Sequence, residues 1–155
     1  MLQRIQTLYL LTTIVLMVVL FFLPIAGMQN VQDAIFYELN YQGLYEVNAD
    51  GNILQAPIWM LTVLMLLIPL LTFITIFLFK KRLLQMRLIV FNIVLMAGYY
   101  GMLFIYLWQY AKSLEAKFFM EFASAFPLVC IILNILAFRA VAKDEALIRS
   151  LNRLR

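Results

Sequence analysis

Few side chains in this 155-residue sequence have types that could carry out chemistry. There is no histidine, and Cys130 is the only cysteine, so a zinc cluster, a haem-ligating histidine and a disulfide are excluded. Cys130 lies in the apolar run PLVCIIL, which favours a buried apolar side chain over a reactive thiol. Every carboxylate maps to an expected loop or tail, so no acid is placed for catalysis. We therefore expect a protein that is not an enzyme and needs no cofactor.

Three polar side chains stand inside long apolar stretches, namely Asn92, Asn134 and Arg139. A hydrogen bond between the two asparagines would join two helices, and such bonds contribute roughly 0.6–2 kcal/mol inside a membrane. The asparagines lie at different distances from the ends of their stretches, so direct contact requires a stagger or a third partner. Arg139 lies near the end of its stretch, where its long side chain reaches headgroups. These positions favour contacts between helices over a substrate site.

The composition requires that lipid surrounds the elements that carry these residues. The chain is 66% hydrophobic and 13% charged, whereas soluble proteins average about 45–50% and about 25%. An apolar helix of about 20 residues crosses the ~30 Å hydrocarbon core. Four stretches have this length: residues 5–26, 56–79, 88–111 and 122–142. We therefore expect a single membrane domain with an all-α transmembrane fold, a four-helix membrane bundle.

The basic residues indicate how this bundle is oriented, because lysine and arginine in short loops stay on the cytoplasmic side. The bases at one end of the expected helices are Arg4, Lys80, Lys81, Arg82, Arg87, Arg139, Lys143, Arg149, Arg153 and Arg155. The first loop at the other end carries Asp33, Glu38, Glu46 and Asp50. We therefore expect both termini in the cytoplasm. The bases follow helix ends and form no stripe between exposed aromatics, so nucleic-acid binding is not expected.

The outer loop of residues 27–55 is too long to be a mere connector. Within it, LYEVNADGNILQ places Asp50–Gly51 between two β-prone runs, which predicts a β-hairpin. The segment AIFYELNY offers a third strand, so we expect a small acidic β cap on the bundle. The other outer loop, residues 112–121, is short and charge-balanced, and we expect it to extend a helix.

A basic rim on the cytoplasmic side is the candidate site for lipid or partner binding. It consists of Lys80, Lys81, Arg82, Arg87, Arg149 and Arg153. Its last two members belong to the tail, residues 143–155, where Leu147, Ile148, Leu151 and Leu154 share one face of an amphipathic helix. This helix either anchors on the membrane or docks a cytoplasmic partner. Positive-inside topology predicts the same bases, so they do not by themselves identify a ligand.

The segments MLQRIQTLYLL, KKRLLQMRL and KDEALIRSLNRLR cover both ends and the middle of the chain. They resemble the signatures of a family of small four-span bacterial membrane proteins catalogued as a domain of unknown function. Asn152 stands where many members have Asp, and Leu2 where Ile is usual. The resemblance implies four helices and a bacterial inner membrane. The family has no established activity, so the resemblance assigns no functional residue.

These observations favour a non-catalytic integral membrane protein: an accessory subunit, assembly factor or scaffold of a larger membrane complex. Its partners would be membrane lipids and other membrane protein subunits. A small oligomeric channel or transporter is an alternative, lined by Asn92, Asn134 and Arg139, although no stretch carries the acid, histidine or lysine that ion coupling uses. Binding of anionic lipid at the basic rim is a second alternative.

Overall fold

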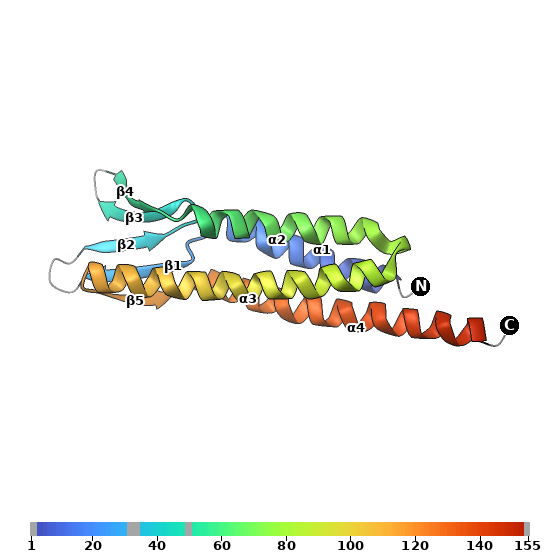
Figure 1. Cartoon of the computed structure of the whole chain (residues 1–155). Helices are drawn as coiled ribbons and strands as arrows, with labels where there is room; N and C mark the ends of the chain where they lie inside the picture. Colours follow the sequence, from blue (N-terminus) through green and yellow to red (C-terminus); the bar gives the residue numbers. More distant parts are fainter. Residues whose placement is uncertain (1–2, 31–34, 49–50, 154–155) are drawn as a thin grey trace.

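A computed structural model describes residues 3–30, 35–48 and 51–153. This part of the chain forms four α-helices, five strands and two short 3-10 helices (Figure 1). In chain order the elements are α1 (Gln3–Leu20), β1 (Ala26–Asn30), β2 (Phe36–Leu39), β3 (Gly43–Asn48), β4 (Gly51–Pro57), α2 (Trp59–Phe77), η1 (Leu78–Lys80), α3 (Arg82–Ser113), β5 (Ala116–Met120), η2 (Phe122–Ala125) and α4 (Phe126–Arg153).

The expectation of an all-α transmembrane four-helix bundle is wrong. The five strands form one antiparallel sheet, and only α2, α3 and α4 are long and apolar enough to cross a membrane among the described residues. The apolar part of α1 is Ile5–Leu20, about 24 Å at 1.5 Å per residue. The apolar run of residues 5–26 was predicted to be one spanning helix, but it contains the end of α1, Pro24 and the start of β1. Hydrophobicity alone does not separate these elements.

The sheet joins two segments that are far apart in the sequence. Its strand order is β4-β3-β2-β1-β5, so β1 pairs with β2 on one side and with β5 on the other. The expected helical extension at residues 112–121 is therefore wrong. Glu115 adopts a positive φ of 49° and turns the chain after α3, so that AKFFM runs back along β1. Pairing with β1 gives the backbone N–H and C=O groups of this apolar segment hydrogen-bond partners.

The hairpin expected around Asp50–Gly51 is present. Strands β3 and β4 pair from Asn48↔Gly51 to Gly43↔Pro57, with an irregularity between Leu44 and Tyr45. The third expected strand is also present as β2, which pairs with β3. Asp50 itself lies outside the described residues. The small cap is thus part of a larger sheet.

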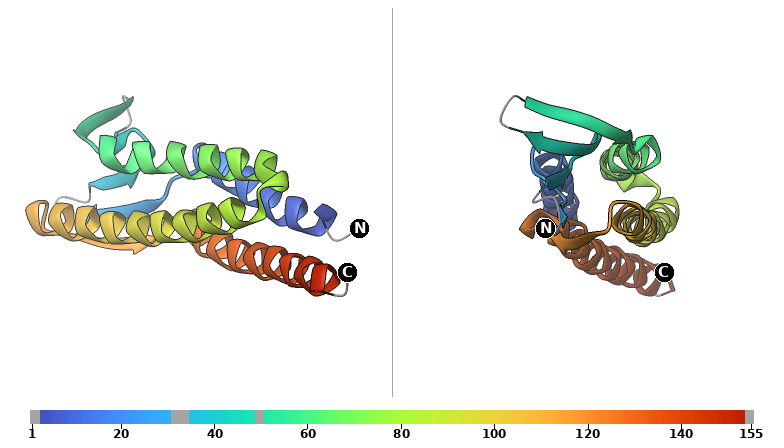
Figure 2. Two further views of the ribbon diagram at one scale, coloured as in Figure 1. Left: turned by 45° about the vertical axis from the view of Figure 1, so that its right-hand side comes forward. Right: turned by 90° about the vertical axis from the view of Figure 1, so that its left-hand side faces the viewer.

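Helix α3 holds the sheet at one end of the helices (Figures 1 and 2). Its 32 residues extend over about 48 Å, which exceeds the ~30 Å hydrocarbon core. Leu103 and Leu107 on its second half share one buried cluster with Met28 and Leu39 of the sheet. The side chain of Asn30 also donates a hydrogen bond to the Leu114 carbonyl at 3.1 Å. The sheet is therefore packed firmly on the end of this helix.

The opposite end of the molecule gathers three parts of the chain. Helix α1 begins there, α4 ends there, and the connection between α2 and α3 lies there too (Figure 1). Helix α4 runs without a break through residues 143–153. At its other end, the Tyr100 hydroxyl donates to the Ser124 carbonyl at 2.6 Å and accepts from the Leu128 N–H at 2.9 Å. Tyr100 therefore satisfies an N–H in the first turn of α4 that the helix itself leaves free.

Candidate functional site

A buried polar cluster lies where the four helices meet, with one residue from each: Thr13, Thr72, Asn92 and Asn134. All four side chains are buried. The Asn92 amide donates to the Thr72 hydroxyl at 2.8 Å and to the Asn134 side-chain oxygen at 3.4 Å. The Asn134 amide in turn donates to the Thr13 hydroxyl at 3.4 Å. The cluster thus links α1, α2, α3 and α4 through side chains.

Three of the four members also bond a carbonyl of their own helix. Thr13 donates to the Tyr9 carbonyl at 3.0 Å, Thr72 to the Ile68 carbonyl at 2.8 Å, and Asn134 to the Cys130 carbonyl at 2.8 Å. The threonine oxygens therefore keep lone pairs for the amides. Asn92 Oδ1 is buried without a partner. The hydrogen bonds within the cluster use most of its polar atoms. None of its four side chains is an acid or a base that could transfer a proton.

Arg139 does not join this cluster. Its side chain is exposed, while Cys130, Asn134, Ala137 and Val141 form the buried face of α4. The channel alternative used Asn92, Asn134 and Arg139 as one lining. The structure places the two asparagines together in the interior and the arginine on the outer surface.

A second buried polar contact lies nearer the end of the molecule at which α1 begins and α4 ends. Gln6 donates to a carboxylate oxygen of Asp144 at 2.7 Å, and both side chains are buried. Gln85, near the start of α3 and four residues before the buried Ile89, is also buried. Among the residues that the structure describes, Asp144 is the only buried carboxylate. The sequence analysis assigned this carboxylate only to the tail and missed this contact.

The basic rim lies beside two grooves between α3 and α4. One groove, of about 500 Å³, is lined by Lys81, Arg82, Leu83, Leu84, Glu145 and Ile148. The other, of about 380 Å³, is lined by Leu83, Met86, Arg87, Val90 and Phe138. Lys81 and Arg87 are exposed and Arg82 is half-buried. The side chains of Lys80, Arg149 and Arg153 lie outside the described part, so the structure brings together only half of the predicted rim.

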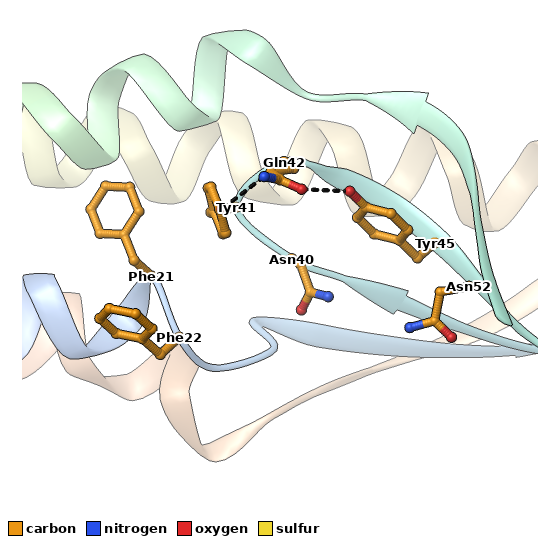
Figure 3. Close-up of a pocket in the computed structure, with 7 residues that line it drawn as sticks. All are labelled: Phe21, Phe22, Asn40, Tyr41, Gln42, Tyr45 and Asn52. Carbon is orange, nitrogen blue, oxygen red and sulfur yellow. Dashed lines mark hydrogen bonds between the residues drawn. The ribbon is translucent and has the colours of Figure 1, made fainter.

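A third candidate site is a pocket of about 340 Å³ between the end of α1 and the sheet (Figure 3). It is lined by Phe21, Phe22, Asn40, Tyr41, Gln42, Tyr45 and Asn52. Gln42 donates to the Tyr41 hydroxyl and accepts from the Tyr45 hydroxyl, each at 2.7 Å. Sequence reasoning missed this pocket. The dense run of aromatic and amide residues from Asn40 to Tyr45 was the available signal.

The described residues contain no group of three His, Cys, Asp or Glu side chains that could hold a metal ion. A family described as Domain of unknown function (DUF4293) matches residues 2–154 of the chain. The chain belongs to this family. The match confirms the expected kinship with a domain of unknown function, and it carries no information about a membrane or an organism. No curated protein matches the chain.

The DUF4293 match covers all three candidate sites. Of these, the buried cluster has the geometry of a structural contact, because its donors and acceptors bind one another. The rim grooves and the sheet pocket are open to the surroundings and are lined in part by polar side chains.

Proposed function

We propose that the chain is a non-catalytic membrane protein that acts as an accessory or assembly component of a larger membrane complex. Three helices long and apolar enough to cross a membrane support the membrane setting. The rule that bases stay inside favours a cytoplasmic rim and cytoplasmic termini. The sheet, at the opposite end, would then face the periplasm of a bacterial inner membrane.

The observation that carries this proposal is the open edge of the sheet at β4. Every residue of β4 is exposed except the half-buried Ala56, and the outer side of β4 has no neighbouring strand in the sheet that the structure describes. Ile53 and Leu54 are 55% and 49% exposed. Soluble and membrane proteins usually protect such an edge with charge or proline. Strand β4 has no charged residue and its one proline, Pro57, is its last residue, so most of this edge is suited to adding a strand from another chain.

The position of β4 points to a membrane protein as the partner. Helix α2 begins at Trp59, directly after β4 ends at Pro57. A strand added to β4 would therefore run within a few residues of the membrane surface. The segment GNILQAP contains no charged residue, which suits a neutral, apolar strand. The expected occupant is an extended segment next to a spanning helix of a neighbouring subunit.

Leu54→Pro tests the proposal at one backbone N–H. In a two-residue hairpin the pair next to the loop is hydrogen-bonded and pairs then alternate. Asn48↔Gly51 is that pair, so the Leu54 N–H, opposite Tyr45, points away from β3. Proline there removes an outward donor and leaves the β3 ladder intact. We expect partner binding to weaken roughly 5–30-fold, as a loss of about 1–2 kcal/mol does.

The measurement is photo-cross-linking from a reactive residue at position 53 in native membranes. The partner band should identify a membrane protein and should fade in Leu54→Pro. Leu54→Thr is the matched control, because it removes the apolar side chain and keeps the N–H. A chain that purifies at native levels only as a free monomer, or a cross-link unaffected by the proline, would refute the proposal.

A further inference from the structure

The pocket between α1 and the sheet is built from the segment that follows α1 and from strands of the sheet. Phe21 and Phe22 directly follow α1, whereas Tyr41 and Gln42 form the turn between β2 and β3 (Figure 3). Thr62 of α2 donates a hydrogen bond to the Tyr41 carbonyl, which fixes this turn to a helix. The Phe21 and Tyr41 rings also pack edge to face, with centroids 5.6 Å apart. The pocket is therefore preformed at the junction of helices and sheet.

The two tyrosine hydroxyls can make complementary hydrogen bonds to a ligand. A side-chain amide has one donating end and one accepting end. Because Gln42 bonds both hydroxyls, one tyrosine must accept from it and the other must donate to it. The Tyr41 hydroxyl accepts and keeps its hydrogen for a ligand, while the Tyr45 hydroxyl donates and keeps its lone pairs. If the Gln42 amide is rotated by 180°, the two tyrosines exchange these roles. One hydroxyl then still has a hydrogen for a ligand, and the other still has its lone pairs.

The remaining polar groups in the pocket are neutral. The side chains of Asn40 and Asn52 line it and have no hydrogen-bond partner in the described part of the chain. None of the described lining residues is an acid, a lysine or an arginine. No described lining residue would form an ion pair with a phosphate or a carboxylate, so only neutral donors would offset the hydration that a charged ligand loses.

Aromatic rings supply the apolar side of the same space. Phe22 is 81% exposed and lies beside the pocket. The volume of about 340 Å³ lies within the roughly 300–1,000 Å³ of small-ligand sites, which combine aromatic walls with a few placed polar groups. A sugar ring matches this combination, because it has C–H groups on its faces and hydroxyls around its rim.

We propose that this pocket binds a neutral sugar ring, whose adjacent hydroxyls contact the tyrosine pair and the side-chain amides of Asn40 and Asn52. The ring comes either from a soluble saccharide or from the headgroup of a glycolipid. This site is separate from the outer edge of β4, so the proposal does not rest on partner binding there.

The test uses the full-length protein in nanodiscs. Maltose, lactose and mannobiose are titrated by ligand-observed NMR, and vesicles of phosphatidylethanolamine with monoglucosyl-diacylglycerol provide the second arm. We expect saturable binding in at least one arm. Tyr45→Phe and Asn52→Ala should each raise the Kd roughly 3–10-fold, as the loss of one neutral hydrogen bond does. Gln55→Ala is the matched control, because this exposed β4 side chain bonds Glu46 and does not line the pocket.

Binding of a soluble disaccharide assigns the site to free saccharide, and binding of the vesicles alone assigns it to a headgroup. Either result supports the proposal if the two pocket variants weaken it and Gln55→Ala does not. No binding in both arms overturns it, and so does binding that the pocket variants leave unchanged. Glucose 6-phosphate binding more tightly than glucose would also overturn it, because the pocket would then favour charge.

Discussion

Gly43→Val is expected to lower the stability of the sheet by about 3 kcal/mol or more, as overpacking against fixed atoms does. A Cβ atom at position 43 would lie 2.5 Å from the Ala56 carbonyl oxygen and 2.5 Å from a methyl carbon of Leu54. The methyl group can rotate away, but the carbonyl belongs to the backbone of β4 opposite. The strands β3 and β4 would therefore have to separate at their end next to α2.

Thermal unfolding of the purified protein in detergent, followed by circular dichroism and by proteolysis of the β3–β4 segment, measures this effect. Gly98→Ala is the control, because a Cβ at that position meets nothing within 4 Å. Alanine in a helix interior should leave stability unchanged or raise it by up to ~1 kcal/mol. Equal melting temperatures for Gly43→Val and the unmodified protein would show that the β3–β4 contact is not as close as described.

Asn134→Leu is expected to destabilise the helices by about 1–3 kcal/mol, because it removes two buried hydrogen bonds to other helices. Asn134 contacts Asn92 and Thr13, and leucine can bond neither of them. For a chain of this length the melting temperature should fall by roughly 2–4 °C for each 1 kcal/mol. Titration with a denaturing detergent provides an independent midpoint.

A double-mutant cycle separates this contact from simple loss of packing. Replacing both Asn92 and Asn134 by leucine removes both ends of the bond, so the double variant should be less destabilised than the sum of the two single variants. Thr12→Val is the matched control, since the exposed Thr12 hydroxyl donates to the Leu8 carbonyl of its own helix. Strict additivity of Asn92→Leu and Asn134→Leu would contradict the interhelical bond.

The sequence indicated much of this architecture, because its signals were local. Long uncharged runs predicted spanning helices, and three helices of that length and hydropathy are present. Asp50–Gly51 between β-prone runs predicted the hairpin, and β3 pairs with β4. Asn92 and Asn134 were conspicuous as amides among apolar residues, and they lie within hydrogen-bond distance.

The features that were missed depend on contacts between distant segments. Strand β5 pairs with β1 across the whole length of α2 and α3, and no local pattern encodes such pairing. Thr13 and Thr72 gave no signal because threonine is readily accommodated in apolar helices by bonding the preceding turn. Asp144 belongs to a charged run, and its burial against Gln6 follows only from the close packing of α1 and α4.

The proposed orientation puts the sheet and the basic rim on opposite sides of a membrane. Cysteine labelling with a membrane-impermeant maleimide tests it most directly, in the unmodified background, because Cys130 is fully buried. Asn52→Cys on the sheet and Lys81→Cys on the rim both replace exposed side chains. We predict that spheroplasts label Asn52→Cys, and that Lys81→Cys reacts only after permeabilisation. Labelling of Lys81→Cys in intact spheroplasts, or of Asn52→Cys only after permeabilisation, would contradict this orientation.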